Sequence, residues 1–319
     1  MKKNIKAIFK VCVSIFLLGY ILFINDISNI IEYFSSITLS IWLFVFLLTA
    51  FQVTLLTMRL ALFFPNRSFF SLLHVRLLST AYGLILPGQL AAEGVRAYLL
   101  GKDDHGYSHS STATIMDKIL GVIALLLFGV AGLLFTDVVA RGVIYVFIFS
   151  GIALTATLFF LNFPFFHERI VLIISPLAAK KSIFGKGAKY LLQITEHWRM
   201  FSKNKILLTK NFIYALVFQL TSVVIGTVLT YGVGAGFHFL DWLWIHTVLA
   251  FALMIPISPG GIGVREGSLI GLLGTIGVQS EQALAVSFAF LALAIVQALA
   301  GIAIEIGGAF QKKKPRHMK

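Results

Sequence analysis

The chain of 319 residues has little charge. Only 12% of its residues are charged, whereas soluble domains average about 25%. The mean hydropathy is +0.92 and 58% of the residues are hydrophobic, which excludes an ordinary soluble enzyme. The long apolar runs instead predict an all-α polytopic membrane protein with a single integral membrane domain, residues 1–319, because a helix of about 20 apolar residues crosses the hydrocarbon core of a bilayer.

Cysteine is almost absent. The one cysteine, Cys12, falls in the first apolar segment, so the chain can form neither an intrachain disulfide nor a thiolate metal cluster. The run from Asp103 to His109 contains side chains that can bind metals, but its spacing matches no strong site and favours a solvated loop. We therefore expect no metal and no other cofactor.

Acidic residues are scarce relative to basic ones. The chain has 26 Lys and Arg against 13 Asp and Glu, a net charge of +13. The basic residues crowd the N-terminus, the segment 164–210 and the C-terminus, and such segments face the cytoplasm under the positive-inside rule. We predict a multi-pass inner-membrane protein with both termini in the cytoplasm. No nucleic-acid-binding motif accompanies the charge, so we expect no nucleic-acid partner.

The chain contains long apolar runs and two regions of shorter apolar pieces. Two regions, about 70–101 and 240–278, each consist of two short apolar pieces interrupted by Pro-Gly, and pieces that short are typical of re-entrant helical hairpins. We expect the first hairpin to enter from the cytoplasm and the second from outside. About six runs are long enough to cross the membrane, and they are roughly 7–25, 39–58, 110–135, 142–163, 211–232 and 284–309.

The two halves of the chain repeat the same order of elements. Residues 1–141 and 142–319 each contain a span, a span, a hairpin and a span, starting from opposite sides of the membrane. This order predicts an internal inverted repeat, in which interrupted helices form a substrate site near the bilayer midplane. Chance spacing of apolar runs is the alternative.

The basic segment 164–210 is too polar to span. Apolar residues such as Tyr190, Ile194 and Trp198 share roughly one helical face. This pattern favours an amphipathic helix on the inner leaflet, attracted by anionic lipids. A plain cytoplasmic linker remains the alternative.

Charged pairs follow both Pro-Gly breaks. L-P-G-Q-L-A-A-E-G-V-R contains Glu93 and Arg96, and S-P-G-G-I-G-V-R-E-G contains Arg265 and Glu266. A charge at membrane depth costs about 2.5–3.5 kcal/mol on insertion scales, so it persists where it faces a cavity, a partner or water. The pairs therefore indicate either a site for a lipid headgroup or ion, or contacts that only hold helices together.

Glycines at the breaks would suit a phosphate. The helix that restarts after Gly260 and Gly261 is expected to expose unpaired N–H groups and the positive end of its dipole. Gly88 offers the same chemistry in the first half. With Arg265 and Arg96 nearby, these donors could hold an anionic headgroup.

Other polar residues are harder to interpret. Asp117 and Lys118 open the third span and either mark a water-exposed helix start or line the same cavity. Arg59 and Arg76 flank the first hairpin, and we expect both to extend toward the lipid headgroups. The predicted substrate-binding residues are Gly88, Glu93, Arg96, Asp117, Lys118, Gly260, Gly261, Arg265 and Glu266.

These motifs resemble a known family. The stretch L-P-G-Q-L-A-A-E-G-V-R-A, the pair Asp117-Lys118 and the stretch P-I-S-P-G-G-I-G-V-R-E-G together resemble the lysylphosphatidylglycerol synthase transmembrane-region family of flippase-like membrane proteins, over nearly the whole chain. The family often has Gly-Glu where this chain has Ala92-Glu93, and Glu-Arg where it has Asp117-Lys118. The charge pattern is kept, and the departures bear on which lipid is bound.

The resemblance implies an inner-membrane flippase or transporter that moves a phosphate-bearing lipid between leaflets. The lipid would be an aminoacyl phospholipid or a polyprenyl-phosphate carrier. The resemblance does not imply the synthase reaction, because that activity belongs to a separate soluble domain and this sequence ends at Lys319.

Two histidines, His74 and His246, lack an identifiable partner, and the sequence shows no nucleophile–base arrangement for covalent catalysis. We expect that the protein is not an enzyme. The alternative is an intramembrane enzyme, or the partner of a lipid-modifying enzyme or glycosyltransferase, that acts on phospholipids or lipid-linked sugars.

Overall fold

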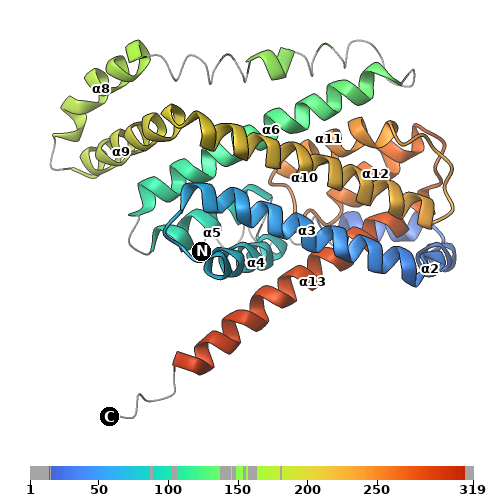
Figure 1. Ribbon diagram of the computed structural model, residues 1–319. Helices are drawn as coiled ribbons and strands as arrows, with labels where there is room; N and C mark the ends of the chain where they lie inside the picture. The colour runs from blue at the N-terminus through green and yellow to red at the C-terminus, as the bar shows by residue number, and fades with distance from the viewer. Residues whose placement is uncertain are drawn as a thin grey trace.

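In the described part of the chain the regular elements are α-helices (Figure 1). Four helices in the described part of the chain are long and apolar enough to cross a membrane, which makes this a multi-pass membrane protein and confirms the predicted all-α fold. The four are α3 (Leu39–Phe63), α6 (Gly106–Leu134), α10 (Lys205–Gly232) and α13 (Ser280–Lys312). The computed structural model describes residues 14, 16–86, 89–102, 106–136, 145, 149–153, 156, 164–179 and 182–312.

The first predicted span ends in a sharp bend. The helix Phe16–Ile24 meets α2 (Ile27–Ser36) at 90°, between the first and second predicted spans. Asp26 starts α2 by accepting a hydrogen bond from the Ser28 N–H at 2.8 Å, as N-cap residues do, and α2 packs against α13. The earlier part of this span and most of the predicted span 142–163 lie outside the described residues.

A broken helix pair lies at each position where a hairpin was predicted. In the first half α4 (Phe69–Ile85) packs against α5 (Gln89–Gly101), and in the second α11 (Asp241–Met254) packs against α12 (Val264–Gly274). Pro87 and Gly88 lie outside the described residues. Whether the pairs re-enter the membrane on one side, and whether the halves form an inverted repeat, stay predictions.

The second break depends on glycine. Gly260, Gly261 and Gly263 have φ angles of +59°, +74° and +85°, a region in which a Cβ is strained. The N–H of Gly263 donates to a carboxylate oxygen of Glu266 at 2.6 Å. This bond fixes the start of α12, as in half of a capping box.

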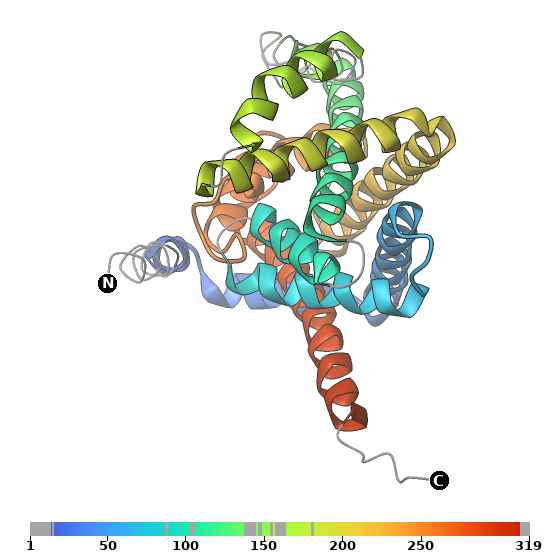
Figure 2. The ribbon, with the colours of Figure 1, turned by 90° about the vertical axis from the view of Figure 1, so that its left-hand side faces the viewer.

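Helices α8 (Pro164–Ala178) and α9 (Ile183–Lys203) lie beside the bundle, and α9 crosses α6 (Figure 2). The hydroxyl groups of Tyr190 and Ser111 lie 2.8 Å apart and tie α9 to α6. The predicted helix in the basic segment is therefore present. Its attachment to anionic lipid stays a prediction.

The largest buried apolar cluster joins α10 to α13 and their neighbours. Trp242 of α11 is fully buried, its indole N–H donates to the Thr230 hydroxyl at 3.0 Å, and a Cβ at Gly226 would lie 2.5 Å from its ring. On the outside, large apolar residues such as Leu39 and Leu47 are exposed. Such side chains suit a lipid solvent, in which helices associate by close packing.

Candidate functional site

A cavity of about 360 Å³ lies between the broken helix pairs and the spanning helices. Its wall includes residues from α3, α4, α5, α6, α10, α11, α12 and α13. The acidic residues in the wall are Glu93 and Asp117. The basic residues in the wall are Arg59, Arg76, Arg96, Lys118 and Arg265.

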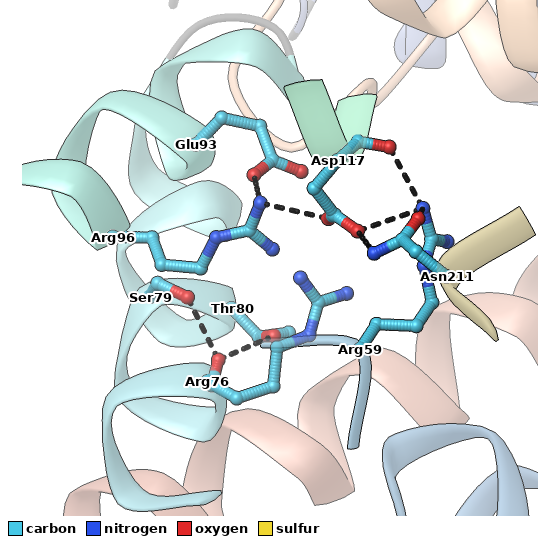
Figure 3. Close-up of polar contacts among 8 residues, drawn as sticks. All are labelled: Arg59, Arg76, Ser79, Thr80, Glu93, Arg96, Asp117 and Asn211. Atoms are coloured by element: carbon cyan, nitrogen blue, oxygen red, sulfur yellow. Dashed lines mark hydrogen bonds and ion pairs between the residues drawn. The ribbon is translucent and has the colours of Figure 1, made fainter. Parts of the chain in front are cut away.

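Asp117 is the centre of a buried ion network (Figure 3). One carboxylate oxygen lies 2.8 Å from the guanidinium of Arg59 and accepts a hydrogen bond from Asn211 at 3.0 Å. The other lies 3.3 Å from the guanidinium of Arg96, which also pairs with Glu93 one helical turn away. The network joins α3, α5, α6 and α10, and its charges are compensated within the protein, as buried charges must be.

The cations around this network are not fully paired. The Nε atoms of Arg59 and Arg96 are buried and have no hydrogen-bond partner within the described part of the chain. Arg76 and Lys118 are half-buried, and neither forms an ion pair with a described residue. Figure 3 shows the Arg76 guanidinium pointing into the space between Arg96 and Arg59. This end of the cavity therefore has an excess of positive charge and unused N–H donors.

Arg265 is neutralised by its neighbour in the sequence. Its guanidinium donates to Glu266 at 3.0 Å and to the Ser287 hydroxyl at 3.0 Å, and Ser287 donates to the same carboxylate oxygen at 2.8 Å. Glu266 is only 1% exposed. Its other oxygen holds the N–H of Gly263, so this carboxylate binds both the cation and the helix start.

The free backbone donors expected at the second break are absent at its four central residues. The N–H groups of Gly260, Gly261 and Ile262 donate to the carbonyls of Leu86, Ser258 and Pro259, and that of Gly263 donates to Glu266. The expectation of free donors at these positions is wrong. Leu86 at the end of α4 accepts the first N–H, the turn folds back so that Ser258 and Pro259 accept the next two, and Glu266 accepts the last.

The structure brings most of the predicted site residues to one cavity. Asp117 and Lys118 line it and do not form a water-exposed helix start. Glu266 is bonded to a lining residue, Gly260 and Gly261 form the second break, and Gly88 lies outside the described residues. The predicted residues in the wall are Glu93, Arg96, Asp117, Lys118 and Arg265.

Sequence reasoning placed two arginines wrongly. Arg59 and Arg76 were expected to reach the lipid headgroups, but both line the cavity, and Arg59 is only 3% exposed. Helix α3 continues to Phe63, so Arg59 lies within the helix and not at its end. The apolar residues that follow Arg59 in the sequence indicated that the helix continues beyond it.

The two histidines also have partners. His246 of α11 shares a hydrogen bond of 2.9 Å with the side-chain oxygen of Gln219 in α10, and both line the cavity. His74 of α4 lies 2.9 Å from the carboxylate of Glu305 in α13. Both contacts join residues of different helices that are far apart in the sequence. Such contacts cannot be predicted from a single sequence.

A protein-family model matches nearly the whole chain. The model for the lysylphosphatidylglycerol synthase TM region matches residues 7–301, which include every residue of the cavity wall. A search of curated proteins and a search of solved structures gave no significant match.

Proposed function

Because the chain belongs to the lysylphosphatidylglycerol synthase TM region family, we propose that it binds the phosphate of a lipid headgroup in the cavity and moves that headgroup between the leaflets. The observation that carries this proposal is the incomplete pairing of cations at one end of the cavity. Arg76 and Lys118 face a buried network that already uses both carboxylates in the wall.

Charge balance favours an anionic ligand. The five basic residues of the wall meet two carboxylates in the wall and a third, Glu266, behind it, which leaves an excess of two positive charges. Uncompensated charge at membrane depth is costly. A phosphate bound to the guanidinium of Arg76 and the ammonium of Lys118 offsets that cost and forms charge-assisted hydrogen bonds.

The volume of the cavity also suits a headgroup. Sites for small molecules usually enclose about 300–1,000 Å³, and this cavity has about 360 Å³. The acyl or prenyl chains would stay outside the cavity. They would lie against the large apolar side chains that are exposed on the outer surface of the helix bundle. Carboxylates such as Glu93 and Glu266 would neutralise the arginines whenever the site is empty.

The broken helices are the parts that would move. Each ends at a break in the backbone, and interrupted helices of this kind form the sites of many transporters. A relative shift of the two breaks would expose the cavity first to one leaflet and then to the other. The drive would be a gradient or mass action. The positive-inside rule, applied to the basic segments, supports a cytoplasmic position of both termini in an inner membrane.

Lipid transport in proteoliposomes tests the proposal. Arg76→Gln with Lys118→Gln should lower the rate of movement of a labelled anionic phospholipid by at least about tenfold, because both unpaired cations are lost. The matched control removes two exposed basic residues outside the cavity, Lys203→Gln with Lys210→Gln, and should keep the native rate. Equal rates for the two double variants would overturn the site.

The same vesicles separate transport from chemistry. If the protein were an intramembrane enzyme, mass spectrometry of the extracted lipids would show an altered headgroup after incubation. Unaltered lipid that has changed leaflet supports transport.

A further inference from the structure

The cavity has a second, chemically different end. Gln52 lies seven residues before Arg59 in α3, and Gln219 lies eight residues after Asn211 in α10. At about 1.5 Å per residue, each is roughly 10–12 Å from the ion network along its helix. Gln52 donates to the hydroxyl of Ser222 in α10 at 2.7 Å. The polar residues of α3 and α10 therefore lie on the same side of the ion network, at the same level of the cavity, and form one layer.

This layer contains amide, hydroxyl and imidazole groups. Gln219 donates to the carbonyl of Gly121 at 3.1 Å and shares a hydrogen bond of 2.9 Å with His246. Gln52, Ser222, Gln219 and His246 all line the cavity. We call these four residues the neutral layer.

The cavity wall also has hydrogen-bonding capacity that the protein does not use. The side-chain oxygen of Gln52 accepts no hydrogen bond from a described residue, since its contacts to Ser222 and Thr221 are made through the nitrogen. The amide of Gln297, which is half-buried and also lines the cavity, makes no side-chain hydrogen bond within the described ranges. A ligand that both donates and accepts hydrogen bonds would satisfy these groups.

The wall offers little to an ammonium group. Its two carboxylates among the described residues, Glu93 and Asp117, are already bonded to arginines. Glu266 has both oxygens occupied by Arg265, Ser287 and the N–H of Gly263. A headgroup amine would therefore enter a cavity with excess positive charge and find no free carboxylate, which disfavours it.

We propose that the headgroup beyond the phosphate is uncharged and rich in hydroxyl groups, as in glycerol, inositol or a sugar, and that the neutral layer binds it together with Gln297. This inference rests on the proposed function, because the phosphate is taken to lie at Arg76 and Lys118. A hydroxyl both donates and accepts, so it can bond to the free oxygen of Gln52 and the free amide of Gln297. The cavity selects phosphodiester lipids with polyol headgroups and rejects those with amines.

A lipid series tests this selectivity. The probes are phosphatidylglycerol, phosphatidylethanol and phosphatidylethanolamine, and binding to the full chain in detergent is measured by native mass spectrometry. Phosphatidylethanol has the same net charge as phosphatidylglycerol and no headgroup hydroxyl. We expect phosphatidylglycerol to bind about fivefold to tenfold more tightly than phosphatidylethanol, the equivalent of one or two buried hydrogen bonds, and phosphatidylethanolamine to bind most weakly.

Variants locate the preference within the cavity. Gln297→Leu and Gln52→Leu should each reduce the preference for phosphatidylglycerol to about twofold or less, because each removes one of the two groups proposed to bond to the hydroxyl, while binding of phosphatidylethanol stays as in the native chain. Retained phosphatidylethanol binding also shows that each variant is folded. Gln193→Leu, at an exposed position in α9, is the matched control and should keep the full preference. A polyprenyl-phosphate hexose as a fourth probe shows whether the polyol is carried on a prenyl chain or on diacylglycerol.

The outcomes separate the two proposals. If no anionic lipid depends on Arg76 and Lys118 for binding, the proposed function fails. If anionic lipids bind through these cations but phosphatidylglycerol and phosphatidylethanol bind equally, only the hydroxyl selectivity fails. Tighter binding of phosphatidylethanolamine than of phosphatidylglycerol would also overturn it.

Discussion

The N–H of Gly260 donates a hydrogen bond to the carbonyl oxygen of Leu86, 3.4 Å away. The bond joins the break of the second helix pair to the end of α4 in the first. Irregular backbone at membrane depth is tolerated when protein surrounds it, and here each broken pair supplies part of that surrounding for the other. A movement of one helix pair would therefore strain or break this hydrogen bond to the other pair.

Gly260→Ala should weaken this contact. The position has a φ of +59°, and a Cβ there would lie 2.8 Å from the carbonyl oxygen of Leu84, so the methyl group meets both backbone strain and a steric clash. We expect a loss of about 1–3 kcal/mol in the free energy of unfolding, measured by denaturation in mixed micelles. Gly271→Ala is the control, since nothing lies within 4 Å of a Cβ at that helical position. Equal stability of the two variants would contradict the role of the contact.

Helix α13 approaches α4 closely through Gly301. A Cβ at this position would lie 2.6 Å from a backbone carbon of Leu77, and backbone atoms cannot move aside as a side chain can. Gly301→Ala should therefore separate the helices and lower the thermal unfolding temperature by several degrees. Gly307→Ala, in the same helix with open space around it, should leave the temperature within about one degree of the native value.

The sequence was sufficient to locate the four spanning helices of the described part of the chain and the second break. Four of the apolar runs are the spanning helices, and Pro-Gly marks the second break at Pro259, where proline lacks the N–H that a helix interior needs and the glycines that follow have positive φ angles. The pairing of Arg265 with Glu266 could also be anticipated, because the two residues are adjacent and a buried arginine needs a carboxylate.

The ion network could not be derived from a single sequence. Arg59, Asp117 and Asn211 come from three helices separated by long stretches of chain, and their contact depends on how those helices pack. The amphipathic helix α2 was also missed, because its ten residues follow the first apolar run directly and only the bend after Ile24 separates the two. The neutral layer escaped notice since glutamines in spanning helices carry no charge that would mark them.

Asp117→Asn should be among the most damaging substitutions. The carboxylate compensates two arginines that are 3% and 2% exposed, and an asparagine leaves them without a charged partner on α6. Breaking a buried pair in this way costs about 3–5 kcal/mol, which we expect to see as a loss of unfolding free energy in an SDS titration followed by circular dichroism. Glu32→Gln removes an exposed carboxylate in α2 and should change stability by less than about 0.5 kcal/mol. A small effect of Asp117→Asn would mean that water solvates the arginines and that they do not depend on Asp117 for charge compensation.

Glu93→Gln should strengthen the binding of an anionic lipid. Glu93 pairs with Arg96, and its side chain is 20% exposed while that of Arg96 is 2% exposed, so the carboxylate lies at the more accessible side of the pair. Removing its charge leaves Arg96 held by Asp117 and raises the positive potential at the cavity. We expect the affinity for phosphatidylethanol to rise about threefold to tenfold, the effect of roughly 1 kcal/mol of Coulomb energy, in the native mass spectrometry assay. Glu196→Gln, at an exposed position in α9, changes the net charge equally and should not alter the affinity. An unchanged or lower affinity in Glu93→Gln would show that this carboxylate does not compete with the ligand for Arg96.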